Sequence, residues 1–528
     1  MRKFEKRQIL KNVGSNWFSL AVNVAVGIFL SPFIMHRLGD AAFGIWVLIF
    51  SVTGYYGVFD LGIRSSIVRY VSKYTATNET DQLARHINTS LATYTGIGAL
   101  SMAVTVVLSF YVDHLFKIPP AMYSQARWIL LMVGASVSLG FPLGVWGGIL
   151  EGLQRFYLLN WTAIGMSLAR AALIVIFLNR GYGLLTLATI TLATPIVIAA
   201  ARILIVHRLL PVPFGPRYVD RESFRQMAHF GGTTMLIIAA AQLRFQTDAM
   251  VIGRMLSAAE ITYFAIGGRI MAYAFQVVAT LAQVFVPMSS QSEAVGNLDR
   301  LRKIYIAGNR ACALVAFPII ATVLILGKSV IEVWVGRKYV PLSYPVVEIL
   351  AIPLMLLMMQ AASGRILIGM GRHKRFATVS LIEGISNVLL SIALVRLFVF
   401  VGWPGIQGDA WGTAIPMACT TLFFMPREMR IQLGVPIRTF VREAYSLPFL
   451  LILPFTAVLL LMRAWFQAHH LWQLVLQVGA GSVVYGIGLL WAYKTRRAFH
   501  IGELVEKVSV PIEIQPVPVL ESEHGTDV

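Results

Sequence analysis

Residues Trp161–Leu178, WTAIGMSLARAALIVIFL, form an apolar stretch with a single charged residue, Arg170, near its middle. A helix needs roughly 20 apolar residues to cross a bilayer core of about 30 Å. A charged side chain at mid-bilayer costs about 2.5–3.5 kcal/mol on insertion scales, so it normally faces a water-filled cavity or a partner. The stretch therefore predicts a membrane-spanning helix that presents a cation to the interior of a helical bundle.

The composition of the whole chain is that of a membrane protein. Of 528 residues, 57% are hydrophobic and 13% are charged, whereas a soluble domain carries about 25% charged residues. The net charge of +19 does not indicate a nucleic-acid partner, because most lysines and arginines lie in short loops between apolar runs. Two cysteines, Cys312 and Cys419, lie inside apolar segments. Their spacing indicates neither a disulfide framework nor a metal site.

Apolar runs of roughly 20 residues or more predict fourteen membrane spans. The expected fold class is therefore an all-α polytopic membrane protein. The spans lie near residues 12–35, 41–70, 86–112, 121–150, 156–178, 183–206, 224–254, 258–287, 304–327, 342–370, 376–400, 407–429, 444–463 and 471–493. Among the lysines and arginines that lie in the loops and tails outside the spans, 26 are on the side of the N-terminus and 9 are on the other side. The positive-inside rule then places both termini in the cytoplasm.

The chain also shows signs of an internal duplication. A shift of 217 residues aligns Gly14 with Gly231 and Arg37 with Arg254 without a gap. Two six-span halves that both begin on the inner side would form a parallel repeat, with its axis along the membrane normal. We expect an N-terminal six-helix lobe, a cytoplasmic linker, a C-terminal six-helix lobe, two extra helices and a cytoplasmic tail that is polar enough to be disordered, at 1–206, 207–223, 224–430, 431–493 and 494–528.

No motif for catalysis or for binding ATP occurs, so we expect no enzyme activity, no cofactor and no metal site. Polar residues instead recur at helical spacing within the spans. They include Asn16, Asn23, Arg269, Tyr273, Gln276, Gln283, Glu383 and Asn387. Such residues either join helices by hydrogen bonds or line a cavity. Packing is the favoured interpretation for the serines and asparagines. The stripe that begins at Arg269 has more polar groups than packing needs and favours a cavity.

The charged residues inside the spans form two groups. Asp60 with Arg64, and Arg244 with Asp248, are spaced four residues apart and could neutralise one another on one helix. That structural interpretation and a functional one remain equally open for both pairs.

Arg170 and Arg269 have no carboxylate within their own helical turn. The planar donor fork of a guanidinium suits phosphate or carboxylate, so we expect these two residues to contact an anion. Four other arginines lie closer to span ends and can extend to the headgroups, namely Arg202, Arg310, Arg365 and Arg396. Asp60, Asp248 and Glu383 are the candidates for a coupling proton or Na⁺.

Three segments carry a family resemblance: GDAAFGIW at Gly39–Trp46, FDLGIRSSIVRY at Phe59–Tyr70, and DAMVIG at Asp248–Gly253. With the fourteen spans, they resemble the polysaccharide flippases of the multidrug/oligosaccharidyl-lipid/polysaccharide exporter superfamily over about residues 8–495. The family's usual glycine-rich turn is replaced here at Leu256–Glu260. The resemblance implies a transporter of undecaprenyl-diphosphate-linked oligosaccharides in the bacterial inner membrane, with a cationic central cavity.

These inferences predict a flippase that moves a lipid-diphosphate-linked oligosaccharide from the cytoplasmic to the outer leaflet by alternating access. Arg170 and Arg269, with Arg244 and Arg64, would receive the diphosphate, and the Asn, Gln and Tyr stripes would bind sugar hydroxyls. The expected partners are this substrate, membrane lipids and a coupling H⁺ or Na⁺, with a polysaccharide polymerase and glycosyltransferases as further candidates.

Three alternatives remain open. A multidrug exporter of the same superfamily would line its cavity with acidic and aromatic residues rather than with an excess of arginine. A lipid II flippase is a closer variant with similar requirements. A membrane scaffold for a polysaccharide-synthesis complex would need no polar path through the bundle.

Overall fold

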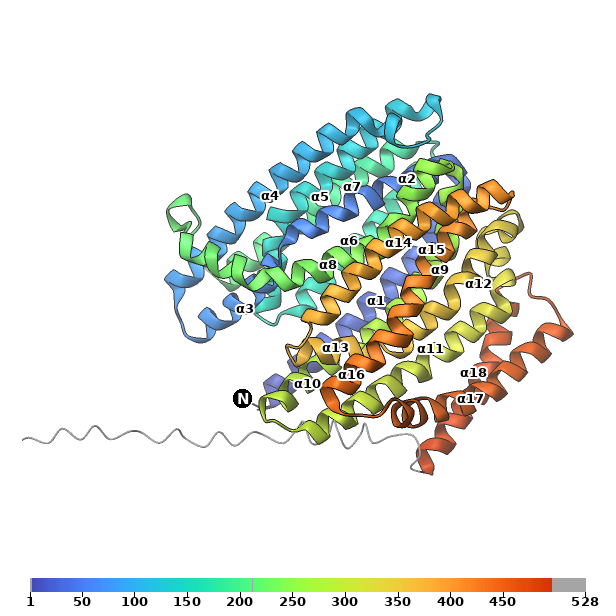
Figure 1. The fold of residues 1–528 in the computed structure, drawn as a ribbon. Helices are drawn as coiled ribbons and strands as arrows, with labels where there is room; N and C mark the ends of the chain where they lie inside the picture. The colour runs from blue at the N-terminus through green and yellow to red at the C-terminus, as the bar shows by residue number, and fades with distance from the viewer. Residues whose placement is uncertain (1, 211, 496–528) are drawn as a thin grey trace, which may run out of the picture.

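The computed structural model describes residues 2–210 and 212–495, and every regular element in this part of the chain is helical (Figure 1). Within these described residues, thirteen helical segments are long and apolar enough to cross a membrane. The predicted all-α polytopic membrane fold is therefore confirmed. The tail that was expected to be disordered lies outside the described residues from position 496 onward.

Seven α-helices form the N-terminal half of the molecule, and within it α4, α5 and α7 pack side by side (Figure 1). The helices are α1 (Arg2–Leu38), α2 (Asp40–Gly54), α3 (Ile63–Ala76), α4 (Thr80–Leu115), α5 (Tyr123–Gly152), α6 (Phe156–Asn179) and α7 (Leu184–Leu209). Two short 3₁₀ helices, η1 (Tyr55–Asp60) and η2 (Pro120–Met122), lie between them. The N-terminus of α1 and the helix α3 lie at the same end of the bundle (Figure 1).

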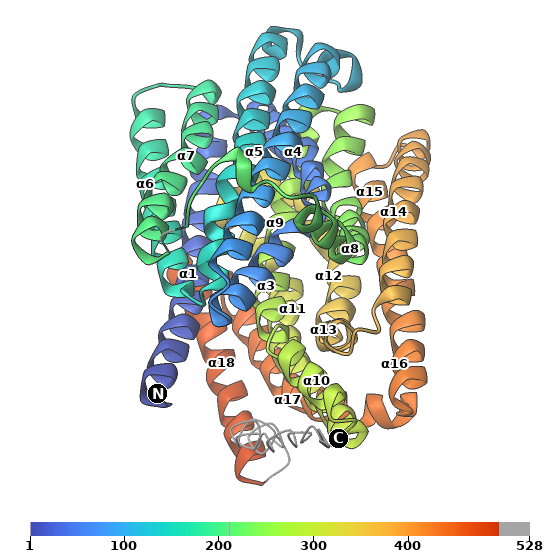
Figure 2. The same ribbon diagram turned by 90° about the vertical axis from the view of Figure 1, so that its left-hand side faces the viewer.

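The C-terminal half runs from α8 to α16. Its helices are α8 (Arg221–Met255), α9 (Ala258–Ala282), α10 (Phe285–Ala294), α11 (Leu298–Val335), α12 (Val340–Met359), α13 (Ala361–Gly369), α14 (Lys374–Val401), α15 (Gly405–Cys419) and α16 (Met425–Leu433), with the 3₁₀ helix η4 (Arg337–Tyr339) and the π-helix η5 (Thr420–Phe424). The last two helices, α17 (Ile437–Trp465) and α18 (Leu471–Lys494), pack along α11. Figure 2 shows the start of α1, α10 and the end of α18 at one end of the bundle.

Several expected spans are broken where the backbone turns. Leu61 and Gly62 have φ of 50° and 73°, so the helix begun by α2 and η1 ends there and α3 starts anew. Glycine adopts such values without the steric cost that other residues incur. The expected spans near 258–287 and 342–370 are likewise each divided, into α9 with α10 and α12 with α13. The expected span near 407–429 is not among the thirteen, but it is helical throughout as α15, η5 and α16.

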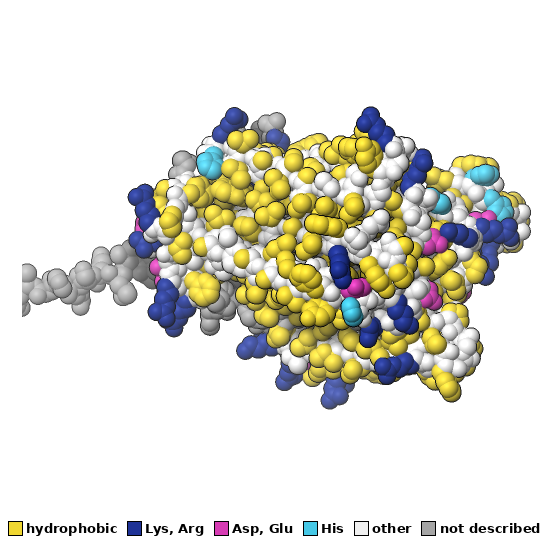
Figure 3. Space-filling view, turned by 90° about the horizontal axis from the view of Figure 1, so that it is seen from above, with side chains coloured by type: hydrophobic (Ala, Val, Ile, Leu, Met, Phe, Trp, Pro, Cys, Tyr) yellow, Lys and Arg dark blue, Asp and Glu magenta, His cyan; other side chains and the backbone are white. Residues whose placement is uncertain are grey.

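The outer surface is apolar, as contact with lipid requires. Phe400 and Trp465 are 89% and 83% exposed, and soluble proteins rarely expose extended apolar patches. In Figure 3, hydrophobic side chains cover much of the visible face and most lysines and arginines lie toward its edges. The surface therefore supports a bundle embedded in a membrane.

The connection between the two halves is packed against the N-terminal half. The side-chain amide of Asn88 on α4 donates to the backbone carbonyl of Pro213 at 3.0 Å. Asp220 caps α8 by accepting from the backbone amide of Ser223 at 2.9 Å, which lowers the pKa of the Asp220 carboxyl. The expected linker at 207–223 thus makes hydrogen bonds to α4 and caps the start of α8.

The two halves meet closely at the end of the bundle opposite the N-terminus. The Asp40 carboxylate at the start of α2 accepts from Lys338 Nζ at 3.1 Å and from the Tyr339 hydroxyl at 2.6 Å, both in η4 just before α12. A Cβ atom on Gly44 would come within 1.7 Å of the Ala258 carbonyl oxygen on α9. Only a glycine permits this approach of α2 to α9, so the backbones of the two halves are in direct contact here.

Candidate functional site

A cavity of about 780 Å³ lies between the two halves. Its walls come from α2 and α6 of the N-terminal half and from α8, α9, α12 and α15 of the C-terminal half. Among the described residues, those that line it with charge are Arg170, Arg244, Arg269 and Asp248. Phenylalanines and Trp46 form much of the remaining wall. The cavity is therefore apolar with an excess of positive charge.

Arg170 is the residue through which α6 reaches the cavity. Its Nη2 donates to Thr191 Oγ1 on α7 at 3.5 Å, which is a weak bond. Its Nε is buried without a hydrogen-bond partner among the described residues. A buried donor without a partner costs free energy, about 1–3 kcal/mol or more for a charged group. The guanidinium of Arg170 therefore has an N–H donor that remains available for a ligand.

Arg244 and Asp248 do not neutralise each other, although both lie on α8. Arg244 forms an ion pair with Glu383 on α14, with an N–O distance of 2.6 Å and both side chains largely buried. Asp248 accepts a hydrogen bond from the Thr413 hydroxyl on α15 at 2.9 Å. The same-helix interpretation of this pair is thus wrong, because the helices that pack against α8 supply closer partners.

Only part of the polar stripe that begins at Arg269 on α9 lines the cavity. Arg269 and Gln276 line the cavity, and Arg269 belongs to no ion pair in the described part of the chain. Tyr273 packs against α1, where its hydroxyl would lie 2.2 Å from a Cβ on Gly27. Gln283 lies at the end of α9, outside the residues that line the cavity.

The asparagine stripe on α1 contacts α6. Asn160 Nδ2 on α6 donates to the Asn16 side-chain oxygen at 2.5 Å, and the Ser167 hydroxyl donates to Asn23 at 3.0 Å. Asn387 on α14 is buried and donates to Thr413 at 3.0 Å. All three asparagines therefore make the helix–helix hydrogen bonds that the packing interpretation describes.

Asp60 and Arg64 are likewise separated. The hydroxyl of Tyr94 on α4 donates to Asp60, and Arg64 binds Glu151 at the end of α5, with an Nη2–Oε1 distance of 2.5 Å. Their four-residue spacing does not place them on one helix, because the turn at Leu61 and Gly62 lies between them. Neither residue lines the cavity.

Asp409 is a buried carboxyl that the sequence analysis did not single out. It lies on α15, is 0% exposed and interacts electrostatically with Asp248. Neither carboxylate oxygen has a hydrogen-bond partner of good geometry among the described residues, although the Ser391 side chain lies beside it. One signal could have drawn attention to it, namely a single acidic residue in the apolar stretch from 405 to 419.

The site has the chemistry of a receptor for a large amphiphilic anion. Arg170, Arg244, Arg269 and Asp248 line a space that aromatic rings also line, and Arg244 is paired with Glu383. Guanidiniums bind phosphate oxygens in pairs, and in a site shielded from water such bonds are stronger than in solution. In the described part of the chain, no group of three or more His, Cys, Asp or Glu residues could hold a metal ion.

Comparison with known proteins places this geometry in context. Residues 34–344, more than half of the chain, match the model of the family Polysacc_synt_3, described as polysaccharide biosynthesis protein. A Shigella flexneri protein named "Putative O-antigen transporter" is 21% identical over 360 residues, which cover 65% of this chain and 81% of that protein. The Bacillus subtilis membrane protein EpsK, itself uncharacterised, is 20% identical over 72% of this chain and 76% of its own length.

Two solved structures of transporters are similar to the chain in fold. The lipid II flippase MurJ in an inward closed conformation aligns with a TM-score of 0.70 at 16% identity, covering 92% of this chain and 99% of MurJ. An inward-facing multidrug resistance transporter of the MATE family, from the MOP superfamily, aligns with a TM-score of 0.67 at 16% identity, covering 79% and 94%.

Proposed function

The chain belongs to the polysaccharide biosynthesis protein family, a flippase family of the MOP superfamily, and from this premise we propose that it moves a lipid-diphosphate-linked oligosaccharide across the bacterial inner membrane. The excess of arginine over carboxylate in the cavity carries this proposal. A diphosphate brings at least two negative charges to mid-membrane, where Arg170 from one half and Arg269 from the other can share them.

The same charge count argues against a multidrug exporter. A cavity for cationic drugs would repel its cargo, because Arg170 and Arg269 are opposed only by Asp248, while Arg244 is already neutralised by Glu383. A scaffold without transport has no use for such a cavity, because charges at mid-membrane are costly to insert. Lipid II also carries a lipid-linked diphosphate, so the charge count does not discriminate against it, and it enters the test below as a competing substrate.

Energy coupling is proposed to reside in the C-terminal half. Asp248 and Asp409 are both buried and interact electrostatically. The Thr413 hydroxyl donates to Asp248, whereas the Asp409 carboxylate has no hydrogen-bond partner of good geometry among the described residues. Two neighbouring carboxylates shielded from water cannot both stay charged without a cation. The pair would therefore bind one H⁺ or Na⁺ at one stage of the transport cycle. Glu383 is the weaker candidate, since Arg244 already neutralises it.

The contacts between the halves suggest which side is closed. Asp40, Lys338 and Tyr339 form a cluster that joins the two halves. With the N-terminus in the cytoplasm, this Asp40 cluster lies at the outer end of the bundle and closes the cavity on that side. Alternating access would then require these contacts to separate when the cavity opens outward.

Replacing Asp40 with Asn should expose the cavity more often to the outer side. The lost ion pair is partly solvent-exposed and contributes about 1 kcal/mol, so the open population should rise about five-fold. The measurement is the labelling rate of a cysteine at Ala265, a cavity residue, by a membrane-impermeant maleimide, with Cys312 and Cys419 replaced by serine.

Asp81→Asn is the matched control, because Asp81 forms an exposed ion pair with Arg85 at the opposite end. It should leave the labelling rate unchanged. Equal labelling in Asp40→Asn and the parent would show that this cluster does not close the cavity.

The function itself is testable in liposomes that contain the purified chain and a fluorescent lipid-diphosphate-linked oligosaccharide. Transfer between leaflets should exceed that in protein-free liposomes at least about ten-fold, which corresponds to about 1.4 kcal/mol of barrier. Parallel samples contain lipid II or a cationic amphiphilic dye. Transport of the dye without transport of the glycan lipid would reject the proposal, and a preference for lipid II would reassign the substrate.

A further inference from the structure

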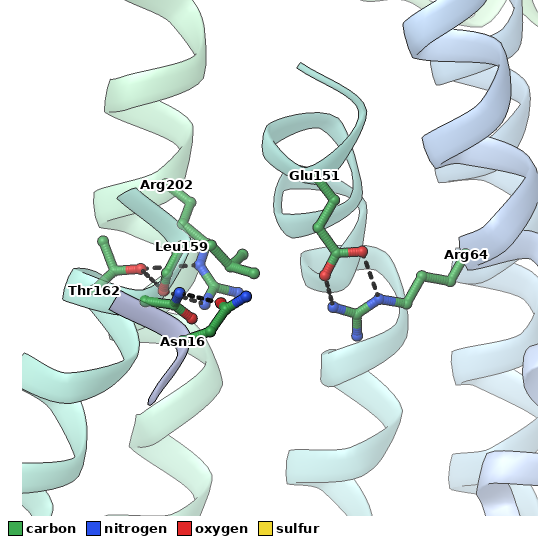
Figure 4. A network of polar contacts seen from close by, with 7 residues as sticks. Asn16, Arg64, Glu151, Leu159, Thr162 and Arg202 are labelled. Atoms are coloured by element: carbon green, nitrogen blue, oxygen red, sulfur yellow. Dashed lines mark hydrogen bonds and ion pairs between the residues drawn. The ribbon is translucent and has the colours of Figure 1, made fainter. Parts of the chain in front are cut away.

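A second group of arginines lies outside the cavity, at the end of the bundle that holds the N-terminus. Arg64 on α3 binds Glu151 on α5, with N–O distances of 2.5 and 3.4 Å. Arg202 on α7 donates to the Thr162 hydroxyl at 3.2 Å and to the Leu159 carbonyl oxygen at 3.5 Å, both on α6. Figure 4 shows the Arg202 cluster beside the Arg64–Glu151 pair. None of these residues lines the cavity.

The charges of this group do not balance. Arg202 bonds to neutral oxygens and forms no ion pair with a described residue, yet it lies within electrostatic reach of both Arg64 and Glu151. Glu151 is paired with Arg64, so the charge of Arg202 is left without an ion-pair partner among the described residues. The side chain of Arg64 is 55% exposed, whereas that of Glu151 is 18% exposed. A ligand can therefore reach Arg64 without unfolding any element.

The same two helices connect this group to the cavity. Arg170 on α6 donates to Thr191 on α7, and Arg202 on α7 donates to Thr162 on α6, so the helices are bridged at two levels. Thr191 and Arg202 are eleven residues apart on one helix, which corresponds to about 16 Å of rise. The two levels thus form consecutive cationic positions along the α6–α7 pair.

We propose that Arg64 and Arg202 form a separate reception site for the diphosphate of the lipid-linked substrate, occupied before the headgroup reaches Arg170. This inference rests on the proposed function. Two guanidinium forks can hold a diphosphate by charge-assisted hydrogen bonds, each stronger than a bond between neutral groups. Glu151 competes with the ligand for Arg64 and so limits the affinity. The limited affinity allows the headgroup to leave for the cavity.

The test measures binding of a fluorescent polyprenyl diphosphate to the full chain in phosphatidylcholine nanodiscs. The background variant Arg170→Gln/Arg269→Gln removes the cavity arginines, so the binding that remains reports on the reception site. Adding Arg202→Gln to this background should weaken binding about ten-fold, as expected for a lost hydrogen bond to a charged group. Adding Glu151→Gln should strengthen binding about ten-fold, a gain that a misfolded protein could not give.

Arg208→Gln is the matched control, because it removes an exposed charge from the same helix as Arg202 without touching this group. It should leave affinity within about two-fold, consistent with the small effect of exposed charges. Inorganic pyrophosphate should compete weakly, and a polyprenyl alcohol of the same length should not compete.

The outcomes separate this inference from the proposed function. Wild-type binding that disappears completely in the background variant would overturn the reception site and leave the flippase function standing. A wild-type chain that binds no polyprenyl diphosphate would overturn both. Tighter binding of pyrophosphate than of the lipid would assign the site to a soluble diphosphate and reject the lipid assignment.

Discussion

Replacing Arg170 with Gln should reduce transport of a lipid-diphosphate-linked saccharide about 30- to 150-fold while the protein still folds. Among the described residues that line the cavity, Arg170 is the charged contribution of the N-terminal half. Loss of charge-assisted hydrogen bonds to a diphosphate costs about 2–3 kcal/mol, which corresponds to that range of rates. Folding should not suffer, because the substitution removes a buried cation whose Nε has no described partner.

Two further variants test the physical reason. Arg170→Lys keeps the positive charge but not the planar fork, so activity should recover only in part. Arg180→Gln removes an exposed arginine just beyond the end of α6 and should change transport less than about two-fold. The measurement is the leaflet-transfer rate in liposomes at equal protein content. Full activity in Arg170→Gln would remove Arg170 from the substrate site.

Much of this fold could be predicted from hydropathy, because lipid contact demands long apolar helices. The expected spans near 86–112, 156–178 and 183–206 correspond to α4, α6 and α7 with small differences at their ends. The breaks within α2–α3 and α9–α10 could not be predicted this way. A turn at Leu61 and Gly62 changes φ without changing hydropathy. Whether the halves form a true repeat stays a prediction.

The candidate site was predictable where a charge had no local partner. Arg170 and Arg269 were distinguished by the absence of a nearby carboxylate, and both line the cavity. The partners of Arg244 and Arg64 were not predictable, because Glu383 and Glu151 are brought close only by helix packing. Polar spacing on one helix likewise cannot tell a cavity wall from a helix interface. The asparagines on α1 share a face, and that face contacts α6.

Asp409, in contrast, could not be predicted as a site residue, since its role depends on packing that sequence spacing does not reveal. Gly412 and Gly408 let α15 approach α14 so closely that a Cβ at either would lie 2.4–2.5 Å from a backbone atom of Ser391 or Leu394. This approach buries Asp409 near Asp248 with no described donor of good geometry on its oxygens. A buried charge without a partner is costly, so a bound cation is the simplest means of satisfying it.

Replacing Asp409 with Asn should therefore abolish the dependence of transport on an ion gradient. The amide has nearly the same shape but carries no charge, so the pair with Asp248 no longer requires a cation. In liposomes, the wild-type rate should rise when a proton or Na⁺ gradient is imposed, and the gradient that acts identifies the ion. In Asp409→Asn the imposed gradient should leave the rate unchanged, whereas downhill exchange of substrate should persist.

Asp299→Asn is the matched control, because Asp299 forms an exposed ion pair with Arg302 three residues away on α11. It should respond to the gradient as the wild type does. Thr413→Val should have an intermediate effect, since it removes the hydroxyl that joins Asn387 to Asp248 but keeps both carboxyls. If Asp409→Asn keeps the full response to the gradient, the cation binds elsewhere, and Glu383 beside Arg244 becomes the residue to replace next.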